Sequence, residues 1–133
     1  MGVDGLTSLR SGHEPAQTVA RLVAEVEARG MQVFARIDHA AGAAEAGLPL
    51  RPTTLVIFGG AKGGTPLMQA AQTIGIDLPL KALVWQDAAS DTWLSYNDPS
   101  WLAQRHGLGL ETAANVEAMA AALDALARTA TSS

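Results

Sequence analysis

The chain contains no cysteine, few aromatic residues and no long apolar run. The lack of cysteine excludes disulfides, thiolate nucleophiles and cysteine metal sites, and it agrees with a reducing compartment. No stretch approaches the roughly 20 consecutive apolar residues that a membrane-spanning helix needs. The start, MGVDGLTSLRSGHEP, lacks the cationic segment and apolar run of a secretory signal. We therefore expect a cytoplasmic protein with no membrane partner.

Positive charge is also scarce. Nine Lys and Arg residues stand against 13 Asp and Glu residues, and the basic residues are scattered from Arg10 to Arg128. Nucleic-acid binding needs clustered basic residues that neutralise phosphates, so we expect no DNA or RNA partner. The 133 residues, 48% of them hydrophobic, fit one domain over residues 1–133, with an ordered core at about residues 7–128.

Two long helices are predicted. The first begins at Pro15 and ends before Gly30, and the second covers about residues 111–128, with a frayed tail at 129–133. In both, apolar side chains recur at helical spacing and mark the face that packs on the rest of the domain. These side chains are Val19, Leu22, Val23 and Val26 in the first helix, and Val116, Met119, Leu123 and Leu126 in the second.

Strands are predicted at residues 7–11, 31–39, 53–58, 81–86 and 92–96. Residues 31–39 alternate, with Val33, Ala35 and Ile37 on one face. The segment TTLVIF, 53–58, is nearly all apolar, which is typical of an interior strand covered on both faces. Residues 87–91 join the last two strands as a hairpin, and residues 40–52 read as a loop with at most one helical turn. The order predicts an α+β domain of β-α-β(4)-α type, whose antiparallel sheet is covered on one face by helices.

The glycine-rich segment FGGAKGGTPLM, residues 58–68, is a candidate anion site. Its spacing does not fit a Walker A loop, because Gly63 and Gly64 separate Lys62 from Thr65. We expect Thr65 to cap a helix that starts at Pro66. Glycine N–H groups, this helix N-terminus and the Lys62 ammonium could hold a carboxylate or phosphate. The alternative, which we favour, is a turn whose glycines take positive φ while Lys62 faces solvent.

The histidines and aromatic residues have structural explanations. Asp38 and His39 are adjacent at a strand end, so on a continuing strand they point to opposite faces. No histidine has partners at metal-ligand spacing, and we expect no metal site and no cofactor. His106 suits the C-terminal end of a short helix that Asp98 caps. The aromatic side chains are expected in the core or at a subunit contact, with Trp93 and Tyr96 on opposite faces of their strand; they are Trp85, Trp93, Tyr96 and Trp101.

Several stretches occur together in a characteristic order: TVARLVAEVEARGMQVFARIDH, LRPTTLVIFGGAKGGTPLM, GIDLPLKALVW and WLSYNDPSWLAQRHG. Over residues 7–128 the chain resembles the bacterial domain-of-unknown-function 302 family. The resemblance implies a topology similar to the half-repeat of the TATA-box-binding protein, a homodimer, and no established activity. In that family the turn more often has asparagine, proline and alanine where this chain has Gly60, Ala61 and Gly63, while Lys62 and Thr65 match.

Three functions stay open. The first is a homodimer that binds a small anion or metabolite. The second is a small enzyme without a separate cofactor, using Lys62 or His39 as general base. The third is a structural or partner-binding module that uses the aromatic hairpin or the C-terminal helix. No catalytic residue is assigned, and the candidate ligand-binding residues are Gly60, Lys62, Gly63, Gly64, Thr65, His39, Trp85 and Tyr96.

Overall fold

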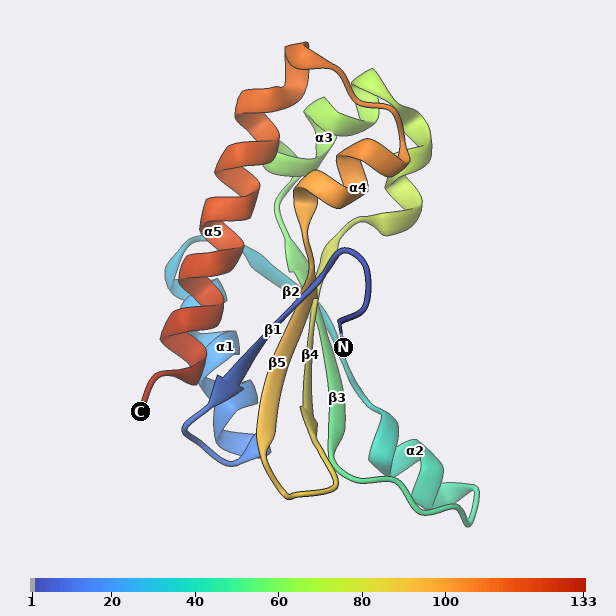
Figure 1. Cartoon of the computed structure of the whole chain (residues 1–133), viewed down its shortest axis with the longest axis vertical. Helices are drawn as coiled ribbons and strands as arrows, with labels where there is room; N and C mark the ends of the chain where they lie inside the picture. Colours follow the sequence, from blue (N-terminus) through green and yellow to red (C-terminus); the bar gives the residue numbers. More distant parts are fainter. Residues whose placement is uncertain (1) are drawn as a thin grey trace.

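A computed structural model describes residues 2–133 as one antiparallel sheet with helices around it (Figure 1). Its strands are β1 (Leu6–Ser11), β2 (Gln32–Asp38), β3 (Thr53–Gly59), β4 (Leu80–Gln86) and β5 (Thr92–Asn97), in the spatial order β1-β5-β4-β3-β2. The helices are α1 (Pro15–Ala28), α2 (His39–Glu45), α3 (Ala61–Ala70), α4 (Pro99–Arg105) and α5 (Ala113–Thr131), with 3-10 turns η1 (Gln72–Asp77) and η2 (Leu110–Thr112). The α+β class and the β-α-β(4)-α order are confirmed.

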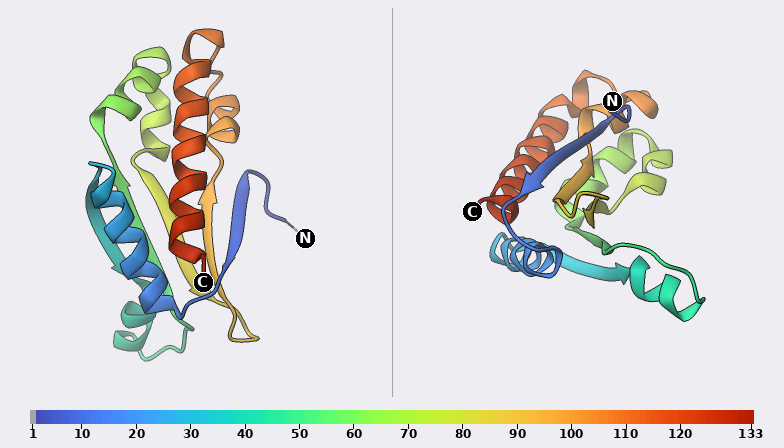
Figure 2. Two further views of the ribbon diagram at one scale, coloured as in Figure 1. Left: turned by 90° about the vertical axis from the view of Figure 1, so that its left-hand side faces the viewer. Right: turned by 60° about the horizontal axis from the view of Figure 1, so that its bottom comes forward.

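One face of the sheet, which we call the inner face, carries the main core. Figure 2 shows that α1 and α5 both lie on this side. The apolar positions of α1 that recur at helical spacing are buried there. Val26 and Phe58 have no exposed surface, and burying each such side chain contributes about 1.5–3 kcal/mol. The inner face of the sheet consists of Val56, Phe58, Ala82, Val84, Leu94 and Tyr96.

The opposite face mixes apolar side chains with polar ones such as Lys81 and Ser95, and its apolar side chains lie outside both buried clusters of the described chain. We define this outer face by Ile37, Leu55, Ile57, Leu83, Trp85 and Trp93, which the strand registers place on one side of the sheet. Leu55 and Ile57 are half-buried, and Ile37 is 40% exposed. The expectation that residues 53–58 are covered on both faces is therefore wrong for the single chain, because α1 and α5 pack on the same side.

A bulge in β2 changes the expected alternation. The register of β2 against β3 shifts between Val33 and Ala35. Val33 lies opposite the buried Phe58 on the inner face, whereas Ala35 lies opposite Ile57 and Ile37 opposite Leu55. An extra residue in one strand reverses the side on which the following side chains point. Placing Val33, Ala35 and Ile37 on one face was therefore wrong.

The C-terminal segment is part of the core, not a frayed tail. Helix α5 runs to Thr131, and Ala130 is fully buried. Gly12 donates its N–H to the Thr131 carbonyl at 2.8 Å, and Arg21 donates to the carbonyls of Thr129 and Ala130. These bonds attach the last turn of α5 to α1 and to the segment before it. Contacts between residues about 100 positions apart cannot be predicted from local composition.

A smaller apolar cluster forms the end of the molecule where α3, η1 and α4 gather (Figure 1). Its buried members are Leu67, Ile74, Leu102 and Val116, one from each of α3, η1, α4 and α5. Leu78 and Met119 contact both this cluster and the main core. The two cores are thus continuous through the upper part of α5.

Candidate functional site

The glycine-rich segment is the first turn of a helix. Helix α3 begins at Ala61 with Gly60 as its N-cap, and Pro66 lies inside it. Gly63 and Gly64 donate their N–H groups to the Gly60 carbonyl at 3.2 and 3.3 Å. The expected helix start at Pro66, with Thr65 as cap, is therefore wrong.

Packing does not require glycine at the start of α3. A Cβ on Gly64 would stand 3.5 Å from Cδ1 of Leu78, and one on Gly63 would stand 3.8 Å from Cε of Met119. Both distances are ordinary van der Waals contacts, so an alanine would fit at either position. Neither glycine has a positive φ; in this segment only Gly59 does, at 155°. The glycines at 63 and 64 are consequently not turn residues of the left-handed type.

The structure does not bring the candidate ligand-binding residues together. Lys62 is exposed in the first turn of α3, whereas His39 is exposed at the start of α2, at the other end of the molecule (Figure 1). Trp85 lies on the outer face of the sheet and Tyr96 on the inner face. At most Lys62, Thr65 and the neighbouring glycines form one group, and their role in binding stays a prediction.

Tyr96 is a poor candidate for acid or base chemistry. Its side chain is in the main core, and only 6% of the residue is exposed. Burial raises the pKa of Tyr96, and the carboxylates of Asp124 and Asp98 raise it further. The phenol therefore stays protonated at neutral pH.

A surface hollow lies away from these residues. It measures about 820 Å³ and opens between the end of β1, the β4–β5 hairpin and the end of α5. Two cations at its border, Arg10 and Arg128, already pair with Asp91 and Asp124 at 2.8 and 2.9 Å. No candidate ligand-binding residue lines this hollow or the second one, of about 570 Å³.

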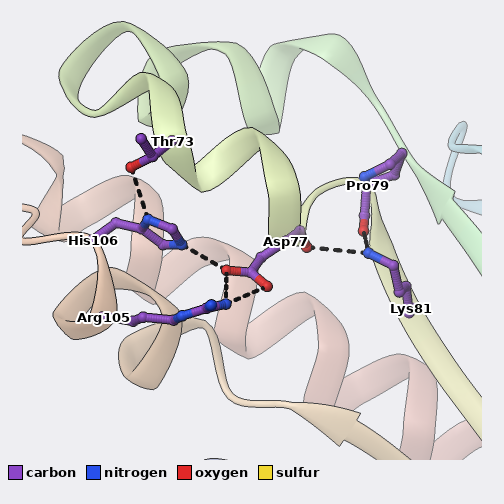
Figure 3. Close-up of polar contacts among 6 residues, drawn as sticks. All are labelled: Thr73, Asp77, Pro79, Lys81, Arg105 and His106. Carbon is purple, nitrogen blue, oxygen red and sulfur yellow. Dashed lines mark hydrogen bonds and ion pairs between the residues drawn. The ribbon is translucent and has the colours of Figure 1, made fainter.

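A polar cluster that sequence reasoning missed joins η1 to the end of α4 (Figure 3). The Asp77 carboxylate accepts hydrogen bonds from the Arg105 guanidinium at 2.8 and 2.9 Å, and its Oδ2 lies 2.6 Å from Nε2 of His106. The other ring nitrogen of His106, Nδ1, lies 2.9 Å from the Thr73 hydroxyl. The His106 side chain is 8% exposed and that of Asp77 is 15% exposed.

The Asp77 cluster links elements rather than forming an evident reaction centre. Hydrogen bonds connect Thr73 to His106 and His106 to Asp77. None of these three residues lines either of the described hollows. Lys81 lies beside it and donates to the Pro79 carbonyl at 2.9 Å. The members come from two separate segments, residues 73–81 and 105–106, so no local motif connects them. The one signal in the sequence was the position of His106 at the end of a helix. Within residues 2–133, no group of three or more His, Asp or Glu side chains is placed to hold a metal ion.

Comparison with known proteins assigns the family. Residues 7–126 match the family model described as "Domain of unknown function DUF302", and the chain belongs to this family. The crystal structure of an uncharacterised conserved DUF302 protein from Bacillus stearothermophilus superimposes with a TM-score of 0.85. It covers 96% of this chain and 99% of that one at 16% sequence identity, so this likeness shows the fold alone.

The curated relatives with similar sequences are named as ion channels. The chain is 52% identical over 115 residues to a protein of Brucella suis biovar 1 named "Fluoride-specific ion channel FluC 1", and equally to one of the same name from Brucella abortus biovar 1. The match covers 86% of this chain but 45% and 43% of those relatives, so the chain spans less than half of their length.

The expectation of no membrane partner is wrong on these comparisons, because an ion channel is a membrane protein. Composition missed the link, since it reports only on the residues of this chain. Within the described residues, no helix has both the length and the apolar character to cross a bilayer.

Proposed function

We propose that this chain is an accessory domain that acts together with a membrane channel for fluoride. The observation that carries the proposal is the 52% identity to a segment of relatives that are named fluoride channels. Most of the length of these relatives lies outside the matched segment. The part that conducts ions would then be supplied by another segment or another polypeptide, and this domain would serve its assembly or regulation.

A segment exchange in the Brucella suis relative tests this proposal. One variant lacks the matched segment, and a second carries the corresponding residues of this chain in its place. We expect the deletion to lower fluoride efflux from loaded vesicles and the exchange to restore it. A third variant, an exchange with Phe58→Asp, serves as the control, because a charge at this fully buried position prevents folding of the domain.

The amount of channel in the membrane is measured for every variant, so that loss of protein is not mistaken for loss of transport. Efflux by the deletion variant equal to that of the full-length relative, at equal abundance, would contradict the proposal. Restoration by the Phe58→Asp exchange would also contradict it, because a folded domain would then not be required.

Small-anion binding at the start of α3 stays a prediction. It is supported by the exposed Lys62 in the first turn of the helix. Calorimetric titration with fluoride and with phosphate, comparing the natural chain with Lys62→Ala, tests it. Identical binding by both proteins would show that Lys62 does not bind the anion. The cytoplasmic location and the homodimer are likewise predictions.

A further inference from the structure

The apolar side chains that the fold leaves in solvent are concentrated in one part of the sequence. Among residues 2–133, eight large apolar side chains are exposed, and four of them lie between residues 34 and 50. These four are Phe34, Ile37, Leu48 and Leu50. Single exposed apolar side chains are common on proteins, but a concentration of them indicates a contact surface.

Two of these side chains lie on a part of the chain that projects from the molecule. We define the arm as residues 39–51, which contain α2, and the tip as residues 47–51, which follow that helix. Figures 1 and 2 show the arm beyond the end of the sheet. Helix α2 contains no buried residue, and Leu48 and Leu50 are 63% and 51% exposed. The tip can therefore reach another surface without bringing the rest of the domain into contact with it.

Two backbone positions of the tip need no water. Gly47, with a φ of 75°, follows the end of α2, and the Leu48 N–H donates to the Ala43 carbonyl at 2.9 Å. Pro49 has no N–H group that could lose a hydrogen bond. Because an unpaired backbone group is costly outside water, these two positions lower the cost of moving the tip into an apolar environment.

The size of the tip suits a lipid surface better than a protein. A standard protein contact takes about 20–30 residues from each partner, far more than residues 47–51 provide. Insertion into the interface of a bilayer only requires apolar side chains to enter about 5–10 Å deep. Arg51 is exposed beside the leucines, and its guanidinium can stay at the level of the lipid head groups.

The charge of the chain favours apolar insertion over electrostatic attachment. The formal net charge is −4, and Arg51 is the one charged residue of the tip. Anionic lipids attract clusters of basic residues, which this chain lacks. We therefore expect Leu48 and Leu50 to provide the attraction, and neutral lipid to be sufficient.

Insertion of the tip is weak by itself. One myristoyl chain gives a membrane association constant of only about 10⁴ M⁻¹, and two leucine side chains contain fewer carbon atoms than that chain. The contact therefore forms when the domain is already held beside a bilayer, where a tether raises the effective concentration of lipid. In the relatives the matching segment is part of a polypeptide named an ion channel, which would provide such a tether.

We propose that the tip inserts Leu48 and Leu50 into the interface of the bilayer that holds the channel, and that this contact orients the domain on the membrane. The inference rests on the proposed function, because the channel brings the bilayer beside the domain. Its test uses lipid vesicles without a channel. A failure there leaves the segment exchange in the Brucella suis relative unaffected, so the two proposals can fail separately.

A fluorescent label beside the tip tests the insertion. The chain has no cysteine, so Ala46→Cys, at an exposed position, carries a single NBD dye, whose emission shifts to the blue in apolar surroundings. A C-terminal hexahistidine holds the chain on phosphatidylcholine vesicles that contain a nickel-chelating lipid. The linker has about 20 Gly and Ser residues and spans roughly 25 Å. We expect a blue shift, and quenching by lipids with a nitroxide near the head group. Neither is expected from a label at Glu111→Cys in η2, at the other end of the molecule.

Charged variants show whether the leucines carry the contact. Leu48→Glu or Leu50→Glu, made in the labelled chain, should lower the inserted fraction by at least about fivefold. Both positions are exposed, so the variants should fold, which circular dichroism checks. Leu110→Glu is the matched control, because Leu110 is 93% exposed and lies in η2. It changes the net charge equally and should leave the signal unchanged.

Four results would overturn the proposal. The first is an identical emission spectrum of the Ala46→Cys label on vesicles and in solution. The second is insertion that persists in both Leu48→Glu and Leu50→Glu. The third is a signal that requires anionic lipid and disappears at high salt, because the contact would then be electrostatic. The fourth is a signal that appears only when the channel segment of the Brucella suis relative is in the vesicles, which would assign the tip to a protein partner.

Discussion

Asp87 organises the β4–β5 hairpin. Its Oδ1 accepts the N–H groups of Ala89 and Asp91 at 3.0 and 2.9 Å, and its Oδ2 accepts the indole N–H of Trp93. The bond from Trp93 is the main cause that lowers the pKa of Asp87 below its ordinary value of 3.8, followed by the bond from Asp91. One carboxylate therefore fixes both the turn and a tryptophan of the outer face.

Because the folded pKa of Asp87 is lowered, its ionised form stabilises the fold above the unfolded pKa, and this contribution is lost as the pH falls through the folded pKa. We expect Asp87→Asn to have a lower melting temperature than the natural chain at pH 7 and a smaller difference at about pH 3, which is below the ordinary value of 3.8. Differential scanning calorimetry measures the melting temperatures of the two proteins at each pH. Asp4→Asn, at an exposed position near the N-terminus, controls for the change in net charge. A difference in melting temperature of equal size at the two pH values would show that ionisation of Asp87 does not contribute to stability.

Gly5 and Gly47 provide a matched pair for separating backbone strain from packing. Both have φ of 75°, but a Cβ on Gly5 would overlap the Trp101 ring, whereas nothing lies within 4 Å of one on Gly47. We expect Gly47→Ala to lower the free energy of unfolding by about 1–2 kcal/mol from strain alone. Gly5→Ala should cost roughly 1–3 kcal/mol more, because the indole must move. Urea titration gives both values, and equal losses would rule out the contact with Trp101.

At the scale of elements, the Asp77 cluster attaches η1 to the end of α4. Asp77→Ala leaves His106, 92% of whose side chain is covered, without its carboxylate partner. We expect a loss of about 1.5–3 kcal/mol, the usual contribution of a hydrogen bond to a charged group. The Arg105 contact adds little, since half of that side chain is in solvent.

Glu25→Gln is the control for this loss. It removes an ion pair with Arg29 within one helix, for which about 0.3–0.5 kcal/mol is expected. Urea unfolding followed by circular dichroism compares the two variants. Similar losses for Asp77→Ala and Glu25→Gln would mean that the cluster contributes no more than a surface ion pair.

At the scale of the whole molecule, the two buried clusters should differ in local stability. The smaller cluster at α3, η1 and α4 has few members and lies beyond the sheet. We expect Ile74→Ala to speed amide exchange in these elements while β3 and β4 stay protected. Leu22→Ala, in the main core, should raise exchange throughout. Hydrogen exchange with mass spectrometry resolves the segments, and a uniform increase in Ile74→Ala would show that the molecule opens as one unit.

The sequence by itself determined the elements whose signals are local. Pro15 and Gly30 mark the ends of α1, the apolar repeats locate the buried faces of α1 and α5, and residues 87–91 form the expected hairpin. These features depend on periodicity and on the backbone preferences of proline and glycine, which act over a few residues. They were sufficient for the α+β class and for the order of the elements.

Only the tertiary structure decided the features that depend on distant contacts. Helix α3 extends back through Gly63 and Gly64 to its N-cap Gly60, and bonds from Gly12 and Arg21 accompany the extension of α5 to Thr131. The Asp77 cluster forms from two segments nearly 30 residues apart, and no spacing rule connects them. Side-chain pattern shows which residues avoid water, but which surface covers them is set by where the whole chain places its helices.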